Sequence, residues 1–154
     1  MADVLDEADR RILRALQADG RMTNLELARR CHLSPAATHD RVRRLREDGV
    51  ITGFAALLDP ARVDRALLIF VEVVLDRTTG EAFEAFAAAI ARTREVLECH
   101  MVAGGFDYLI KARVRDMAAY RAFLGDVLVR APGVRETRTY AVLEEVKSTV
   151  SLAL

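Results

Sequence analysis

Residues 23–46 read TNLELARRCHLSPAATHDRVRRLR and contain two helix start signals separated by a very short turn. Thr23, with Glu26 three residues later, has the spacing of a capping box and predicts that a helix begins there. Ser34 and Pro35 repeat the signal, because a hydroxyl N-cap is followed by a proline at the first helical position. Only three residues, Cys-His-Leu, separate the two helices. Such a turn makes the helices cross steeply, as in a helix-turn-helix.

The second helix of this pair is the most basic part of the chain. It carries Arg41, Arg43, Arg44 and Arg46, and residues 21–46 contain seven basic and two acidic side chains, whereas the whole chain has a formal net charge of zero. This concentration of positive charge, on a helix after a tight turn, predicts insertion into a DNA major groove. Because only two of the chain's 23 basic residues are lysines, the choice of arginine at any one position says little about guanine recognition.

The start and the body of this helix are expected to play different parts. The first residues of a recognition helix reach base edges, whereas arginines further along meet phosphates. Asp40 would accept a hydrogen bond from a cytosine, or instead pair with Arg43 or Arg44 on its own helix. A basic helix face can also be merely solvated. The predicted DNA-contacting residues are Ser34, Ala36, Ala37, His39, Asp40, Arg41, Arg43 and Arg44.

Composition excludes several classes of protein. At 52% apolar residues the chain can form a packed core, which argues against disorder. The Cys-His pairs at 31–32 and 99–100 have the wrong spacing for a zinc site, so no metal is expected. The Gly104-Gly105 pair lacks the motifs of a phosphate loop and of a dinucleotide site, so no cofactor is expected. Residues 1–11 lack a signal-peptide apolar region, and no uncharged apolar run approaches the ~20 residues of a membrane helix. A cytoplasmic, nucleoid-associated protein without a membrane partner is therefore expected.

The chain is predicted to contain two domains and a connection. Residues 1–50 form three helices, the first over Asp6–Asp19, and residues 51–60 form a strand or hinge because Val50–Leu58 has β character. The rest, 61–154, has the order β-α-β-β-α-β of a ferredoxin-like domain. Both faces of its first strand, LLIFVEVVL, are mostly apolar, so an uncovered face and dimerisation are expected. The predicted elements lie at 67–75, 81–93, 96–102, 107–114, 116–130 and 134–147. The fold class is α+β.

Several strings along the chain resemble one family. LDEADRRIL, LSPAATHDRVRRLREDGVITGFAALLDP, ECHMVAGGFDYLIKARVRDMAAYR and PGVRETRTYAVLEEVK, between Leu5 and about Lys147, are similar to the Lrp/AsnC (leucine-responsive, feast/famine) transcriptional regulators. The resemblance implies an N-terminal DNA-binding domain, a hinge strand and a ferredoxin-like domain that senses a small molecule. It also implies dimers that pair through their sheets and close into octamers.

The resemblance further implies an amino acid effector bound in clefts between dimers. Leucine is the first choice, because Met101, Ala141 and Val142 would form an apolar wall. The Gly104-Gly105 pair is expected at a turn that needs positive φ and lets a ligand carboxylate approach backbone N–H groups. The effector-binding residues carried over are Met101, Gly104, Gly105, Phe106, Asp107, Thr139, Tyr140, Ala141 and Val142.

Two positions depart from the family pattern. Gly105 stands where the family loop commonly has an acidic residue, so a contact to an effector's ammonium group would be missing. His32 stands in the turn where glycine is usual. A left-handed backbone at that position costs histidine more than glycine.

The sequence thus predicts a transcriptional regulator that binds roughly palindromic double-stranded DNA and responds to an amino acid. Two-fold dimers predict half-sites about one helical turn, or a multiple of it, apart. One alternative is a ligand-insensitive architectural protein that wraps DNA around a ring. Another is an enzyme, since some tetrapyrrole-modifying decarboxylases resemble the family, but the intact basic helix argues against it. No nucleophile–base constellation appears in the sequence, so no enzyme is expected.

Overall fold

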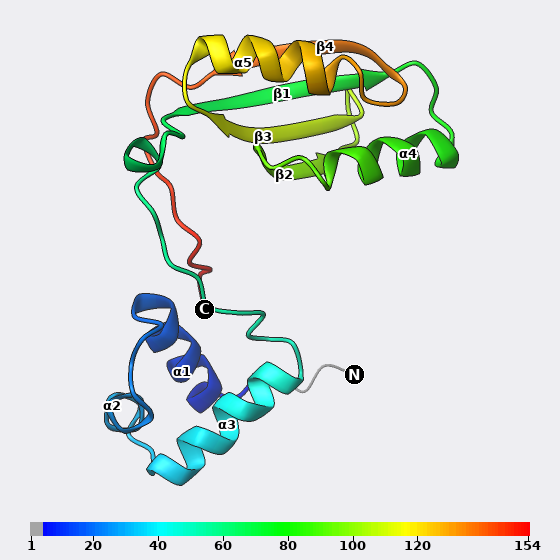
Figure 1. Cartoon of the computed structure of the whole chain (residues 1–154). Coiled ribbons are helices and arrows are strands. Elements are labelled where there is room, and N and C mark those ends of the chain that lie inside the picture. The colour runs from blue at the N-terminus through cyan, green and yellow to red at the C-terminus, as the bar shows by residue number, and fades with distance from the viewer. Residues whose placement is uncertain (1–4) are drawn as a thin grey trace. The chain divides into compact units, whose positions relative to one another are not determined.

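The computed structural model describes residues 5–154, which form two compact units (Figure 1). The N-terminal unit runs to Ala56 and also includes Lys147–Leu154, and the C-terminal unit is Leu57–Val146. The expectation about a signal peptide in residues 1–11 lies partly outside the described residues. Among the helices that are described, none is both long and apolar enough to cross a membrane.

The three helices expected at the N-terminus are confirmed. They are α1 (Glu7–Ala18), α2 (Asn24–Cys31) and α3 (Pro35–Glu47). The Thr23 side chain accepts from the Glu26 backbone N–H, and the Glu26 side chain accepts from the Thr23 backbone, as the capping-box spacing predicted. The Ser34 hydroxyl caps α3 by accepting from the backbone N–H of Ala37. The helices enclose a small core formed by Ile12, Leu13, Ala15, Leu27, Cys31 and Leu45.

The connection after α3 contains no strand. Gly49 ends the helix with φ 72°, but residues 52–59 have no regular structure. A strand needs a partner for its ladder of hydrogen bonds, and no strand of the described chain pairs with this segment. The strand expected over Val50–Leu58 is therefore not formed within one chain, which leaves the hinge interpretation. Leu57 and Leu58 stay largely exposed.

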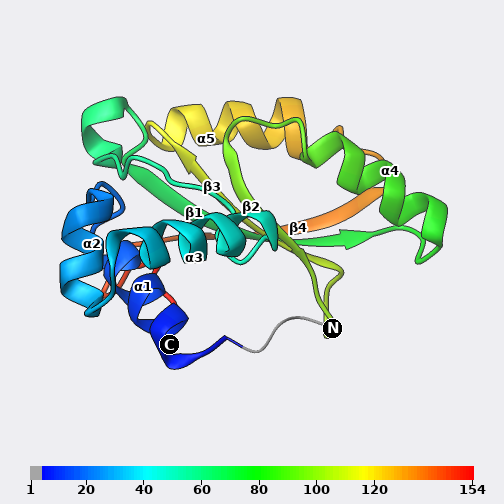
Figure 2. The ribbon, with the colours of Figure 1, turned by 90° about the horizontal axis from the view of Figure 1, so that it is seen from below.

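The C-terminal unit is the expected ferredoxin-like domain. Its elements are β1 (Leu67–Leu75), α4 (Gly80–Ile90), β2 (Val96–Met101), β3 (Tyr108–Val114), α5 (Met117–Phe123) and β4 (Val134–Ala141). The four strands form one sheet in the order β2-β3-β1-β4, and all neighbours are antiparallel. Figure 2 shows α4 and α5 on the same side of this sheet. The α+β fold class is confirmed.

Three predicted elements end clearly earlier than expected, and the first is the helix expected over 81–93, which stops at Ile90. The helix expected over 116–130 is α-helical only to Phe123 and continues as a π-helical turn over Leu124–Leu128, a segment that contains the poor helix former Gly125. The last strand stops at Ala141 instead of continuing toward Lys147. The Val142 backbone N–H still donates to the Leu68 carbonyl at 3.0 Å. Because β1 begins at Leu67, no strand among residues 5–154 lies alongside the residues after 143.

Alternation along β1 separates the two sheet faces. Ile69, Val71 and Val73 are fully buried, and they pack in one core with Phe86 and Phe123 of the helices. The side chains of β1 that alternate with these lie on the opposite face. On that face β1 places three apolar side chains and the acid Glu72, and Leu109 of β3 lies opposite Glu72. Lys111 of β3 lies on the same face and pairs with Glu98 of β2, so the face becomes charged toward that edge of the sheet. The expectation that both faces of this strand are mostly apolar is confirmed, and dimerisation through the sheet stays a prediction.

Candidate DNA-binding surface and ligand loop

The turn between α2 and α3 depends on one left-handed residue. His32 has φ 55° and ψ 48°, a conformation that glycine adopts most easily. The next backbone N–H, of Leu33, donates to the Ala28 carbonyl at 2.9 Å and so closes the end of α2. The Asn24 side-chain amide at the start of α2 donates to the Pro35 carbonyl at 2.8 Å. These contacts fix the start of α3 against α2.

The first turn of α3 presents small and polar side chains to solvent. Thr38 is fully buried, and its hydroxyl donates to the Ser34 carbonyl at 3.0 Å. This anchors the inner side of the helix. Among the predicted base-reading residues, Ala36, His39 and Asp40 are exposed, whereas Ala37 is half-buried. Ser34 is exposed as well. Contact of these residues with DNA stays a prediction.

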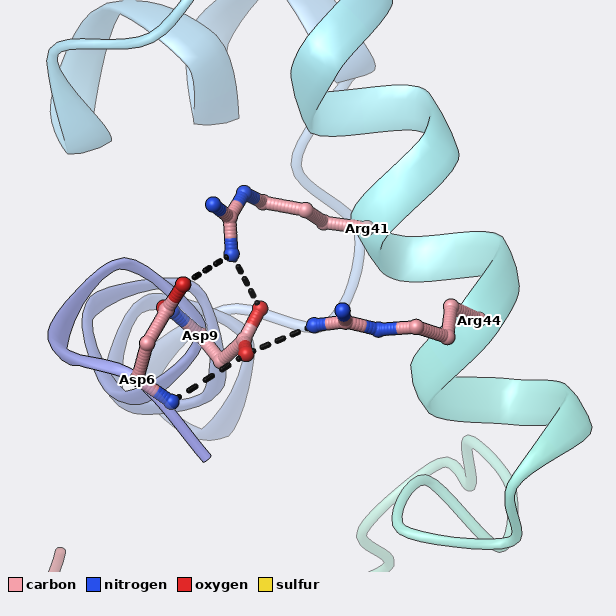
Figure 3. A network of polar contacts seen from close by, with 4 residues as sticks. All are labelled: Asp6, Asp9, Arg41 and Arg44. Atoms are coloured by element: carbon pink, nitrogen blue, oxygen red, sulfur yellow. Dashed lines mark hydrogen bonds and ion pairs between the residues drawn. The ribbon is translucent and has the colours of Figure 1, made fainter. Parts of the chain in front are cut away.

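Arg41 and Arg44 form ion pairs with α1 (Figure 3). Nη1 of Arg41 lies 2.7 Å from Oδ2 of Asp6 and 2.8 Å from Oδ1 of Asp9. Nη2 of Arg44 lies 2.7 Å from Oδ2 of Asp9, a side chain that is only 2% exposed. The sequence had placed both arginines on an open helix face, because partners more than 30 positions away cannot be recognised from helical spacing.

This network also shifts two pKa values. The backbone N–H of Asp9 and then the Arg41 guanidinium hold the pKa of the Asp6 carboxyl below its ordinary value. Conversely, hydrogen bonds to Asp6 and Asp9 raise the pKa of Arg41. Both shifts favour the charged forms, so the Asp6–Arg41 pair is ionic at neutral pH.

Arg43 and Arg46 lie on the exposed part of α3. Arg43 is 3.3 Å from Asp40 and 4.0 Å from Glu47, both on its own helix. Exposed ion pairs of this kind are weak and exchange readily. The contact between Asp40 and Arg43 agrees with the interpretation that Asp40 pairs with an arginine of its own helix. Arg46 has no ion pair among residues 5–154. These two arginines therefore keep positive charge available to phosphates.

The loop between β2 and β3 is a closed hairpin. Val102 donates to the Asp107 carbonyl at 3.0 Å, and the Asp107 backbone N–H donates to Val73 at 2.9 Å. The Asp107 carboxylate accepts from the Leu75 backbone N–H at 2.7 Å, so one of its oxygens is already occupied. Positive φ was expected at Gly104 and Gly105, and this is wrong: the positive-φ glycines of the described chain are elsewhere.

The loop borders a hollow of ≈ 280 Å³. A Cβ added to either loop glycine would meet no atom within 4 Å, so their backbone faces open space. Arg77 and Arg135 line the same hollow and, within residues 5–154, form no ion pair. Neither arginine was predicted from the sequence, although Arg77 follows the end of β1 and Arg135 lies at the start of β4. The predicted residues that line this hollow are Gly104, Gly105, Phe106 and Asp107.

The remaining predicted effector residues lie away from this hollow. Thr139 pairs with Val71 in the middle of β1, and Ala141 pairs with Ile69 nearer its start. Met101 adjoins the loop, because it pairs with Tyr108 at the end of β2, but it does not line the hollow. The Tyr140 hydroxyl donates to Glu72 at 3.0 Å. One chain therefore does not bring the β4 segment Thr139–Val142 together with the loop.

Comparison with known families covers nearly the whole chain. Residues 68–152 match the family described as the Lrp/AsnC ligand binding domain, and residues 5–52 match a winged helix-turn-helix DNA-binding family. The chain is 52% identical over 150 residues to the leucine-responsive regulatory protein of Salmonella typhimurium, covering 97% of this chain and 92% of that protein. The chain is 51% identical over 150 residues to the protein of the same name from Escherichia coli K12, again covering 97% of this chain and 92% of that protein.

Solved structures give the same assignment. A transcriptional regulator from Neisseria meningitidis in complex with L-Met superposes with a TM-score of 0.92 at 39% identity, covering 97% of each chain. An AsnC family transcriptional regulator from Agrobacterium tumefaciens also gives 0.92, at 32% identity and 97% coverage of both chains. These similarities extend over both units rather than one.

Proposed function

We propose that this chain, which belongs to the Lrp/AsnC family of ligand-responsive DNA-binding transcription regulators, binds paired DNA half-sites as a homo-oligomer whose assembly an amino acid controls. The observation that carries the DNA-binding part is the capped α3, which follows a left-handed turn at His32 and exposes small and polar side chains at its start. A helix presented this way fits a major groove. The named relatives are regulators, not enzymes.

The DNA contacts are divided along α3. Ala36, Ala37, His39 and Asp40 meet base edges from the first turn and a half. Ser34 contacts the DNA backbone beside those bases. Phosphate contacts come from Arg43 and Arg46 rather than from Arg41 and Arg44, because the latter pair is engaged by carboxylates. Phosphate contacts set overall affinity and its salt dependence, whereas base contacts set sequence preference.

The effector is a hydrophobic amino acid, with leucine first and methionine second. Relatives at about half identity carry the name leucine-responsive regulatory protein, and a structural neighbour at 39% identity was solved with L-Met. The hollow beside Gly104 and Gly105 offers open backbone and the guanidinium groups of Arg77 and Arg135 to a carboxylate. The side chain of the bound amino acid would contact the apolar residues of β4.

Assembly completes the effector site. The loop at Gly104–Asp107 and the β4 segment Thr139–Val142 lie at different positions along β1 in one chain. A ligand that touches both groups therefore needs a second chain, which supports clefts between dimers and an octamer of four dimers. By linkage, the ligand shifts assembly only as far as it prefers one assembly over another. Two-fold dimers again imply roughly palindromic operators.

The DNA-binding part is tested by a double variant, Arg43→Ala with Arg46→Ala. Fluorescence anisotropy of labelled duplexes at several salt concentrations should show weaker binding to every sequence. Losing two phosphate contacts should reduce the slope of log affinity against log salt by about 2 per protomer. Arg121→Ala, an exposed arginine of α5, is the matched control and should bind like the parent. If affinity and slope do not change in the double variant, α3 is not the DNA-binding helix.

The effector part is tested by calorimetric titration with each of the twenty amino acids. Leucine or methionine should release or absorb heat and shift the oligomer distribution in sedimentation. Arg77→Ala and Arg135→Ala should each weaken that binding, since each removes one guanidinium from the carboxylate. Absence of heat from all twenty would contradict the effector assignment. It would favour the ligand-insensitive architectural protein, in line with the absence of an acid at Gly105.

A further inference from the structure

We propose that Asp9 is a positioning residue for sequence-specific DNA binding, although it lies on α1 and touches no DNA in the proposed complex. Through Arg41 and Arg44 it holds α3 at the angle at which base contacts form (Figure 3). This inference rests on the proposed function. It adds a residue from outside the recognition helix to those that determine sequence preference.

Both oxygens of the Asp9 carboxylate are used by α3. Oδ1 is 2.8 Å from Nη1 of Arg41, and Oδ2 is 2.7 Å from Nη2 of Arg44. The two arginines are three positions apart and so lie on one face of the helix. Asp9 is 2% exposed, while its partners are 29% and 44% exposed. The carboxylate thus sits between the arginines as a buried bridge.

The bridge is joined to the start of α1. Asp6 accepts from the Asp9 backbone N–H at 2.8 Å through one oxygen, and from Arg41 at 2.7 Å through the other. Oδ2 of Asp9 in turn accepts from the Asp6 backbone at 3.3 Å. The capping box of α1 and the arginines of α3 therefore form one network of two carboxylates and two guanidiniums. Rotation of α3 against α1 would break the ion pairs and leave the two capping carboxylates without their cations.

Burial makes this network difficult to break. A carboxylate shielded from water that loses a charged partner is strongly unfavourable. Arg41 and Arg44 therefore stay on Asp9 instead of extending to phosphates. Their contribution to DNA binding is the orientation of the exposed start of α3. Hydrogen bonds to base edges depend steeply on angle and distance, whereas attraction to phosphates does not. Loosening the network should consequently reduce sequence preference more than general affinity.

The test is Asp9→Asn in the full chain. The probes are a duplex selected from random DNA by the parent protein and a scrambled duplex of the same composition. Charge alone would strengthen binding of the variant to both duplexes, because a negative group is removed. We expect the opposite for the selected duplex, a loss of roughly tenfold, which corresponds to one good base contact. The scrambled duplex should be bound slightly more tightly than by the parent, because only the charge effect acts there.

Two control variants separate orientation from stability. Glu7→Gln removes an exposed carboxylate of α1 that pairs with Arg14 rather than with α3, and should keep the parental preference. Leu27→Ala removes a buried side chain of the same unit and lowers stability without touching the network. At a temperature where circular dichroism shows all variants folded, Leu27→Ala should also keep the preference.

The ratio of selected to scrambled affinity tests the role of Asp9. If Asp9→Asn keeps the parental ratio of selected to scrambled affinity, or loses no more of it than Leu27→Ala, Asp9 is not a positioning residue. If the parent protein itself prefers no sequence, the proposed sequence-specific regulator fails and this inference falls with it. A preference in the parent that is lost only in Asp9→Asn supports both.

Discussion

At the scale of single residues, His32 shows how the turn of the DNA-binding motif is made. Its φ of 55° lies in the left-handed region, where a side chain with a Cβ is strained. His32→Gly should therefore stabilise the N-terminal unit. The gain should be only about 0.5 kcal/mol, because relief of strain is partly offset by the larger chain entropy of unfolded glycine. Thermal unfolding followed by circular dichroism measures this difference.

His32→Val is the matched control. A β-branched side chain is disfavoured still more at positive φ, so this variant should lose about 1–2 kcal/mol. Equal stability of the histidine, glycine and valine proteins would mean that the turn does not adopt the left-handed conformation in solution.

Local contacts at the DNA-binding site could be predicted from the sequence, whereas contacts between helices could not. Thr23, Ser34 and the exposed start of α3 followed from local spacing, because a cap involves residues only three positions apart. The bonds from Arg41 and Arg44 to Asp9 span 32 and 35 positions. Such pairs depend on how two helices pack, so neither charge counting nor helical periodicity separates these arginines from Arg43 and Arg46.

At the scale of elements, side-chain caps link helix stability to pH. The Asp9 backbone N–H lowers the pKa of Asp6, Thr23 lowers the pKa of Glu26, and the Ala119 backbone N–H lowers the pKa of Asp116. A carboxyl with a lowered folded-state pKa stabilises the fold above its unfolded pKa of about 4. That contribution disappears as the pH falls through the lower, folded value.

Acid titration should therefore reduce helix stability below pH of about 4. Circular dichroism melts between neutral and acidic pH check this. Thr23→Ala removes the main cause of the Glu26 shift, so it should lower stability at neutral pH and lose less stability on acidification than the parent. A difference between the two proteins that stays constant across this pH range would show that the cap does not titrate.

Element boundaries were predicted where the signal was local and missed where pairing decided them. The order βαββαβ followed from changes of hydrophobic period along the chain. The ends of β4 and the absence of a strand over Val50–Leu58 depend on which backbone lies alongside. The π-helical turn at Leu124–Leu128 likewise interrupts a continuous apolar pattern that predicted a single helix.

At the scale of the whole molecule, the chain returns to its first unit at its end. The Leu152 backbone N–H donates to the Gln17 side chain at 2.6 Å, and the Gln17 amide donates back to the Leu152 carbonyl at 3.0 Å. Arg14 donates to the Leu154 carbonyl at 3.1 Å. The helix-turn-helix unit is thus attached to the ligand-binding unit by two stretches of chain, residues 52–59 and the segment after β4.

Gln17→Ala should release this C-terminal segment and lower the free energy of unfolding of the N-terminal unit by about 1–2 kcal/mol, since two hydrogen bonds are lost. Gln17→Glu keeps the acceptor for Leu152 and loses the donor, so it should fall between the parent and the alanine variant. Thermal unfolding monitors stability, and proteolysis of residues 147–154 monitors docking. Parental stability and protease resistance in Gln17→Ala would show that the segment does not dock in solution.

In the proposed function, an amino acid bound to the C-terminal unit changes which DNA the N-terminal unit occupies. The most direct test of this proposal is mapping of DNA bound by the full chain across the genome, with and without added leucine or methionine. We predict discrete sites that contain roughly palindromic half-sites, and a change in occupancy at a subset of them when either amino acid is present. Occupancy without discrete sites, or an identical map in every condition, would contradict the proposal.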